Sequence, residues 1–108
     1  MNEPTARILV ADDEESNVEI LTRILGKAGF DVRAARSGPE ALDLLRESPP
    51  TDLLLTDLRM PGMDGLELLK AARTVSPETE VVVMTAFGTV EIAVEAMQQG
   101  AYDFLTKP

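Results

Sequence analysis

The sequence predicts an α/β fold, a doubly wound parallel sheet of five strands with helices on both faces. Three short apolar runs, at residues 8–11, 53–55 and 81–84, predict strands that are buried on both faces. Helical patterns separate these runs, so strands and helices alternate along the chain. With 108 residues, the chain has the size of one domain with one core.

Two weaker strand candidates, at residues 31–35 and 102–106, bring the expected number of strands to five. The expected order is strand and helix repeated four times, with a fifth strand at the end. Because crossovers between parallel strands are right-handed, such a chain forms a doubly wound sheet. Periodicity does not give the order of the strands across the sheet, and no fifth helix is expected in this chain.

Four amphipathic helices are expected between the strands. The first ends at Gly29, since glycine is favoured just beyond a helix. The second begins at the capping-box pattern of residues 37–40, and the third begins in the same way at residues 64–67. The fourth runs over about residues 89–99 and ends at Gly100. The expected apolar stripes, in helix order, are Val18, Leu21, Leu25 and Ala28; Ala41, Leu44 and Leu45; Leu66, Leu69 and Ala72; and Val90, Ala93, Val94 and Met97.

The fourth helix also carries four polar residues that are expected to face outward. They are Glu91, Glu95, Gln98 and Gln99. A partner surface formed by this helix is therefore expected to be polar, although a solvated face is the default explanation for these residues.

The composition limits the reactions and binding partners that are open to this chain. The net charge of −9 argues against direct nucleic-acid binding, which needs clustered Lys and Arg. The absence of Cys and His excludes disulfides, thiolate nucleophiles, the usual zinc sites and phosphohistidine chemistry on this chain. No apolar run approaches the ~20 residues that a membrane span needs. The remaining reactive groups are carboxylates, hydroxyls and lysine.

Five polar residues fall at the ends of the predicted strands. They are Asp12, Asp13, Asp57, Thr85 and Lys107. The carboxyl ends of parallel strands meet at one edge of an open α/β sheet, where ligands bind, so these residues are expected to converge. Three carboxylates brought close repel one another unless a cation intervenes, and Mg²⁺ suits a site with oxygen ligands. One carboxylate can then act as a nucleophile that forms an aspartyl phosphate, while lysine and threonine contact the phosphoryl oxygens.

Each residue also has a simpler explanation. Asp12 and Asp13 precede a helix, where acids are favoured as caps. Asp57 precedes residues 58–62, a segment rich in turn formers. Thr85 and Lys107 are ordinary surface residue types when taken singly. The phosphoryl-transfer hypothesis is favoured because the simpler explanations would all have to hold at the same edge of one sheet.

The same residues resemble a known family. Asp12-Asp13 after a strand, Asp57 before the stretch at residues 60–65, Thr85-Ala86 and Lys107-Pro108 are similar to the response-regulator receiver domains of two-component signalling. The resemblance covers essentially the whole chain. It implies a flavodoxin-like sheet with strand order 2-1-3-4-5.

The resemblance also implies roles for individual residues. Asp57 would be the phosphoacceptor, and Mg²⁺ or Mn²⁺ would be held by Asp12, Asp13, Asp57 and the backbone carbonyl of Arg59. Thr85, Ala86 and Lys107 would bind the phosphoryl group.

A conformational switch is implied as well. Thr85 would move toward the phosphoryl group while Phe104 turns inward, although Phe104 alone is as readily explained as a core residue. Tyr102 is the rival for the aromatic role, but its spacing from the lysine fits less well. The family also implies a cis peptide bond before Pro108. It implies further that Arg59 and Phe87 tune the lifetime of the phosphate.

At the level of the whole protein, the resemblance implies a signalling domain that catalyses only its own phosphorylation and dephosphorylation. A sensor histidine kinase would be the donor. The stretch at residues 84–108 looks more narrowly like NtrC-type transcriptional activators, in which ATPase and DNA-binding domains follow the receiver. We therefore expect residues 1–108 to be a receiver domain cut from a longer cytoplasmic regulator, with a homodimer as one possible assembly. A stand-alone receiver is the alternative.

Three other functions fit the sequence less well. A metal-dependent phosphatase of the haloacid dehalogenase type would have a second acid two residues after the nucleophile, where this chain has Arg59. A degenerate receiver that serves only as an interaction domain is disfavoured by the full acidic set. A nucleotide-binding module is disfavoured because no Gly-rich loop follows the first strand.

Overall fold

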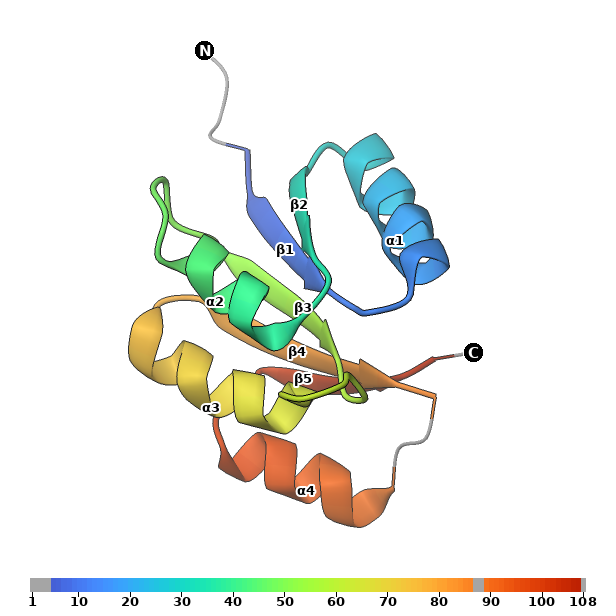
Figure 1. The fold of residues 1–108 in the computed structure, drawn as a ribbon, viewed down its shortest axis with the longest axis vertical. Coiled ribbons are helices and arrows are strands. Elements are labelled where there is room, and N and C mark those ends of the chain that lie inside the picture. The colour runs from blue at the N-terminus through green and yellow to red at the C-terminus, as the bar shows by residue number, and fades with distance from the viewer. Residues whose placement is uncertain (1–4, 87–88, 108) are drawn as a thin grey trace.

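A single parallel sheet organises the fold. The computed structural model describes residues 5–86 and 89–107, and its five strands lie in the order β2-β1-β3-β4-β5 (Figure 1). Every pair of neighbouring strands is parallel. The strands are β1 (Arg7–Ala11), β2 (Asp31–Ala35), β3 (Leu53–Asp57), β4 (Glu80–Thr85) and β5 (Asp103–Thr106). The predicted fold class and the strand order implied by the resemblance are both confirmed.

Four helices cover the two faces of this sheet. They are α1 (Glu15–Lys27), α2 (Gly38–Leu45), α3 (Gly65–Val75) and α4 (Val90–Gln98). In Figure 1, α1 lies on one side of the sheet and the other three helices lie on the opposite side. All four predicted helices are confirmed, and the described residues contain no fifth helix. Among residues 5–86 and 89–107, no helix combines the length and the apolar character that a membrane crossing requires.

The main hydrophobic core lies between the sheet and the three helices α2, α3 and α4. Leu9, Leu54 and Val83 are fully buried in it, together with Leu68 and Leu69 of α3. Because side chains alternate along a strand, neighbours such as Val10 point to the opposite face, where α1 lies. β1 and most of β4 are therefore buried on both faces, which explains their continuous apolar runs, whereas Leu55 of β3 is only partly buried on the α1 side.

Local signals fix where the helices begin and end. At α3, Glu67 N donates to Asp64 Oδ1 at 2.9 Å and Asp64 N donates to Glu67 Oε1 at 3.1 Å, so the predicted capping box is complete. At α2, Glu40 N donates to Ser37 Oγ at 3.2 Å, which is the first half of such a box. Gly29 follows α1 with a φ of +99°, a conformation that favours glycine.

The predicted inner face of α4 is wrong for Val90, Val94 and Met97, whereas Ala93 is partly buried. Val90 is 77% exposed and Val94 and Met97 are about half exposed, whereas Ala96 is fully buried and Ile92 packs against the core. The small Ala96 side chain allows close packing of α4, and this contact sets the orientation of the helix. The expectation of a purely polar partner surface is wrong for the same reason, since exposed apolar side chains accompany the polar ones.

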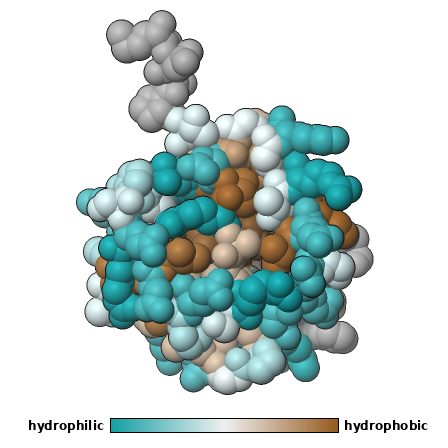
Figure 2. Space-filling model, turned by 45° about the horizontal axis from the view of Figure 1, so that its top comes forward, coloured by the Kyte–Doolittle hydropathy of each residue, from teal (hydrophilic) through white to brown (hydrophobic). Residues whose placement is uncertain are grey.

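A second apolar surface lies beside α1. Ile20 and Ile24 are both more than half exposed, and a hollow of about 320 Å³ runs between α1 and the end of β4. Its lining includes Met84 and Lys107. These isoleucines are exposed in the described part of the chain, which contains no fifth helix. On the face drawn in Figure 2, hydrophobic residues are visible in hollows between hydrophilic ones.

The complete burial of Leu54 in the main core predicts a large loss of stability when this side chain is shortened. Leu54→Ala should lower the free energy of unfolding by about 2–5 kcal/mol, because a fully buried leucine would leave a cavity. The exposed Ile24→Ala variant serves as the control and should change stability by no more than about 0.5 kcal/mol. Urea unfolding followed by circular dichroism measures both, and equal losses would contradict the assignment of the core.

Candidate functional site

The predicted site residues meet at the carboxyl-terminal edge of the sheet. Asp12 follows β1, Asp57 ends β3, Thr85 ends β4 and Lys107 follows β5. A hollow of about 400 Å³ opens at this edge. Its lining residues are Asp13, Glu14, Asn17, Asp57, Arg59, Thr85, Ala86 and Lys107. Segments nearly a hundred residues apart therefore form one site, because all the strands run in the same direction.

Three carboxylates form a cluster in this site. One oxygen each from Asp12, Asp13 and Asp57 lies within 4.8 Å of the other two. Asp12 is 1% exposed, while Asp13 and Asp57 are partly open to the hollow. Such a set of hard oxygen ligands, open on one side, suits a divalent cation that keeps several of its waters, as Mg²⁺ does.

Lys107 joins two of these acids. Its Nζ lies 3.2 Å from Asp12 Oδ2 and 3.2 Å from Asp57 Oδ1. Both pairs are largely shielded from water, so their attraction is stronger than that of a surface ion pair. The backbone N–H of Lys107 also donates to the Thr85 carbonyl at 2.8 Å, which ties the end of β5 to the end of β4.

Burial raises the pKa of the Asp57 carboxyl above its ordinary value. The nearby Lys107 ammonium opposes this rise, and the negative charge of Asp12 adds to it. For Lys107, burial alone would lower the pKa, but the hydrogen bond to Asp12 and the charge of Asp57 outweigh burial and raise it. Lys107 is therefore a cation at neutral pH, and ionised Asp57 carries an electrostatic cost that a further cation would relieve.

The structure does not support the simpler explanation that Asp12 and Asp13 are caps of helix α1. The N-cap of α1 is Glu14, which makes no side-chain cap hydrogen bond. Asp12 instead accepts a hydrogen bond from Glu14 N at 3.0 Å, through Oδ1, while its Oδ2 faces Lys107. One carboxylate thus both shapes the loop after β1 and contributes to the site.

The remaining predicted residues lie around the cluster. Thr85 is 1% exposed and Ala86 is exposed at the rim. Phe104 is partly buried and packs against the core, and Tyr102 is 67% exposed. Arg59 lines the hollow. The expectations for Phe87 and for the bond to Pro108 fall outside the described residues.

Three neighbours of the site were not predicted from the sequence. Glu14 and Asn17 line the hollow, and Asn17 Nδ2 donates to Glu14 Oε2 at 3.4 Å. The spacing of Asn17, one helical turn after Asp13, could have indicated its place. Arg36 Nη2 donates to the Asp13 carbonyl at 3.4 Å, and nothing in the sequence pattern links these two residues.

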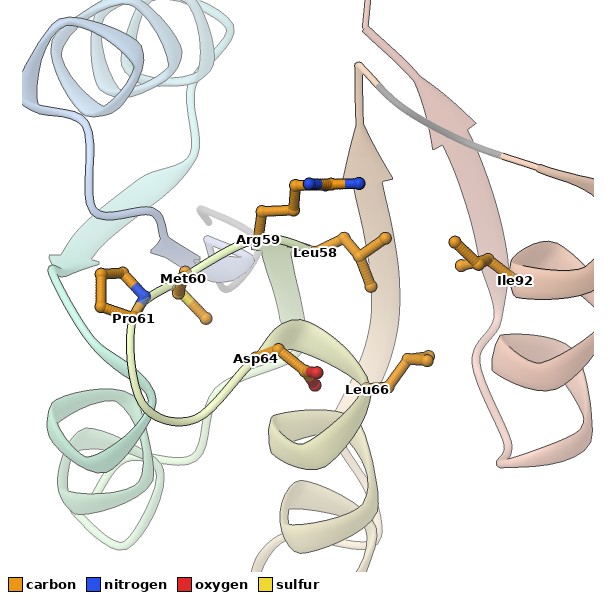
Figure 3. Close-up of a pocket in the computed structure, with 7 residues that line it drawn as sticks. All are labelled: Leu58, Arg59, Met60, Pro61, Asp64, Leu66 and Ile92. Carbon is orange, nitrogen blue, oxygen red and sulfur yellow. The ribbon is translucent and has the colours of Figure 1, made fainter.

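A larger and less polar hollow lies beside the site. It has a volume of about 480 Å³ and lies between the loop after β3 and the first turn of α4. Figure 3 shows Leu58, Leu66 and Ile92 projecting toward its interior, from three different elements. Arg59 lines this hollow as well as the acidic one, so the loop after β3 forms a wall of both.

The strand order, with an acidic cluster and a lysine at the carboxyl edge of the sheet, is that of a signalling receiver domain, and sequence comparison identifies the family. Residues 8–108 match the response regulator receiver domain family, and the chain belongs to it. It is 46% identical over 101 residues to the transcriptional regulatory protein ZraR of Klebsiella oxytoca, covering 94% of this chain and 23% of that protein. It is 45% identical over 101 residues to the DNA-binding transcriptional regulator NtrC of Escherichia coli K12, covering 94% and 21%.

Solved structures agree with this assignment. The beryllofluoride-activated NtrC4 receiver domain dimer superposes with a TM-score of 0.87 at 37% identity, covering 94% of this chain and 84% of that one. A response regulator of Burkholderia pseudomallei, solved with a phosphorylated aspartic acid and a calcium ion, superposes with a TM-score of 0.88 at 31% identity, covering 95% and 60%. This chain spans less than a quarter of the length of the curated relatives named above.

The raised pKa of Asp57 predicts how the site affects stability. At neutral pH, without divalent cations, Asp57→Asn should raise the melting temperature, because it removes a buried charge while its amide oxygen can still face Lys107. The gain should shrink as pH falls toward the ordinary value of 3.8, where the wild-type carboxyl becomes protonated.

Asp43→Asn is the control for net charge, since Asp43 is 79% exposed. It should give a smaller gain. Thermal denaturation in buffer containing a chelator measures all three proteins. A lower melting temperature for Asp57→Asn than for wild type would mean that the ion pair with Lys107 outweighs burial.

Proposed function

We propose that this receiver domain accepts a phosphoryl group on Asp57 from a sensor histidine kinase, in a reaction that depends on Mg²⁺ or Mn²⁺. The observation that carries the proposal is the contact of Asp57 with both a carboxylate cluster and the Lys107 ammonium, at the open edge of the sheet. The phosphorylated aspartic acid in the Burkholderia pseudomallei relative supports it.

The residues present fit a divalent cation. Asp12, Asp13 and Asp57 would supply carboxylate oxygens, and the Arg59 carbonyl would supply a backbone ligand. Bound there, the cation would place positive charge beside the phosphoryl oxygens.

The side chains of this chain would divide the work of transfer. An Asp57 carboxylate oxygen attacks phosphorus, and the new oxygen–phosphorus bond forms as the phosphorus–nitrogen bond to the donor histidine breaks, with the electron pair leaving on nitrogen. Lys107 holds a phosphoryl oxygen by its charge, and the Thr85 hydroxyl and Ala86 N–H donate to the others. The domain is not a turnover enzyme in this proposal, since it catalyses only its own phosphorylation and dephosphorylation.

The central test is labelling by a small phosphodonor. Incubation with acetyl phosphate and Mg²⁺ should add the mass of one phosphoryl group, and a chelator should prevent it. Asp57→Asn should abolish the addition, whereas the surface variant Asp43→Asn should label like wild type. Intact-protein mass spectrometry reads the result, and labelling of Asp57→Asn would place the phosphoacceptor elsewhere.

We further propose that phosphorylation acts through Thr85 and Phe104. Thr85 ends β4, directly beside the site, and its strand neighbour β5 carries Phe104. Movement of the buried Thr85 hydroxyl toward a phosphoryl oxygen would open space into which Phe104 can turn from its partly buried position. The population of an active conformation of α4 and β5 would rise as a result.

Beryllofluoride, a phosphoryl mimic, tests this switch. In the presence of Mg²⁺ it should shift the amide signals of Thr85 and Phe104 and of residues in α4. In Thr85→Val the mimic should still shift signals near Asp57 but move Phe104 much less, because the hydroxyl that couples them is gone. Identical shifts at Phe104 in both proteins, measured by ¹H–¹⁵N spectra, would refute the coupling.

We propose that residues 1–108 form the receiver of a longer regulator, with ATPase and DNA-binding domains as its output, because the relatives are transcriptional regulators more than four times as long. The location would be the cytoplasm, where such regulators reach DNA. The acidic surface, with a net charge of −9, leaves DNA contact to the output domain. A homodimer is an assembly state we propose for the phosphorylated form, as in the NtrC4 receiver.

A further inference from the structure

The first residue of α3 lies directly against the backbone of the proposed phosphoacceptor. A Cβ atom added at Gly65 would overlap with the Asp57 carbonyl oxygen and lie 2.8 Å from Leu58 Cα. The Gly65 N–H also donates to the Leu58 carbonyl at 2.8 Å, which closes the loop between β3 and α3 at its base. Both neighbours are backbone atoms and cannot move aside as a side chain could, so only glycine fits here.

We propose that Gly65 is a positioning residue for the phosphoacceptor and its metal, an inference that rests on the proposed function. Its bare Cα lets α3 hold the peptide between Asp57 and Leu58 in place. That peptide orients the Asp57 side chain and leads directly to the Arg59 carbonyl. Any side chain at position 65 must displace it, and a shift of a few tenths of an ångström changes the ligand geometry that Mg²⁺ demands.

A second glycine, Gly38, also packs closely against the loop after β3. A Cβ atom added at Gly38, at the start of α2, would lie 2.6 Å from Met63 Sδ and 2.8 Å from Met63 Cβ. The loop after β3 therefore packs against bare glycine Cα atoms at the beginnings of two helices. The Asp64 capping box fixes its end. These contacts leave the loop little freedom, although it is built largely from turn-forming residues.

The test compares two Gly→Ala substitutions. In Gly65→Ala, we expect Mg²⁺ affinity to fall by about 10-fold, as is typical when a residue that orients metal ligands is lost. The rate of acetyl phosphate labelling at saturating Mg²⁺ should fall as well. Gly26→Ala is the matched control, since nothing lies within 4 Å of the Cβ atom added there, in α1. It should leave both quantities at wild-type values.

Affinity is measured by isothermal titration calorimetry at a temperature where circular dichroism shows each variant to be folded. A purely structural role for Gly65 would lower the melting temperature but leave the affinity and the labelling rate of the folded protein unchanged. That result, or equal behaviour of Gly65→Ala and Gly26→Ala, would overturn the inference.

A second variant decides the question if Gly65→Ala does not fold. Gly38→Ala reaches the same loop through a side chain that can partly move, so it should weaken Mg²⁺ binding less severely. Adding Met63→Ala removes Sδ and Cγ, two of the three closest atoms, and should restore part of the lost affinity. Unchanged affinity in Gly38→Ala, or no recovery in the double variant relative to Met63→Ala alone, counts against the inference.

The proposed function can fail separately. Wild-type protein that neither binds Mg²⁺ nor labels with acetyl phosphate would refute the phosphoacceptor assignment itself. Wild-type protein that does both, together with a Gly65→Ala variant that matches it, would refute only the positioning role.

Discussion

A single ammonium group sets the arrangement of the site. Lys107 lies 3.2 Å from carboxylate oxygens of both Asp12 and Asp57, and so links the ends of β5, β1 and β3. Without it, the acids at the ends of two neighbouring strands would lie close together with no cation between them, and like charges in a shielded site repel one another. Parallel strands bring these groups together, and the lysine makes their proximity tolerable. Asp13 adds a third carboxylate whose oxygen lies within 4.8 Å of the other two, so negative charge is concentrated at this edge of the sheet.

Much of this arrangement could be predicted from the sequence. Strands that are buried on both faces have continuous apolar sequences. Polar residues that directly follow such strands in a parallel sheet meet at one edge, so Asp57 and Lys107 could be placed together from the sequence. The strand order could not be obtained in this way, since it depends on contacts between elements. It came from family resemblance, which the observed sheet confirms.

Other features depend on packing that no local pattern reports. In α4, two overlapping stripes were available, and the more apolar one lies outside while the small Ala96 faces inward. Hydrophobicity favoured Val90 and Val94, but packing against the sheet places Ala96 and Ile92 inward instead. The role of Gly65 was hidden for a similar reason. In the sequence it belongs to the pattern that begins a helix, whereas in space its missing side chain makes room for the backbone of another element.

The exposure of Tyr102 has a practical consequence. The chain contains one tyrosine and no tryptophan, so this phenol dominates its near-ultraviolet absorption and emission. Tyr102 is 67% exposed and directly precedes β5, two residues before Phe104. The domain therefore carries a native optical reporter beside the segment assigned to the switch. Binding of a partner, or rearrangement of this surface, can be followed by its intrinsic fluorescence without attaching a dye.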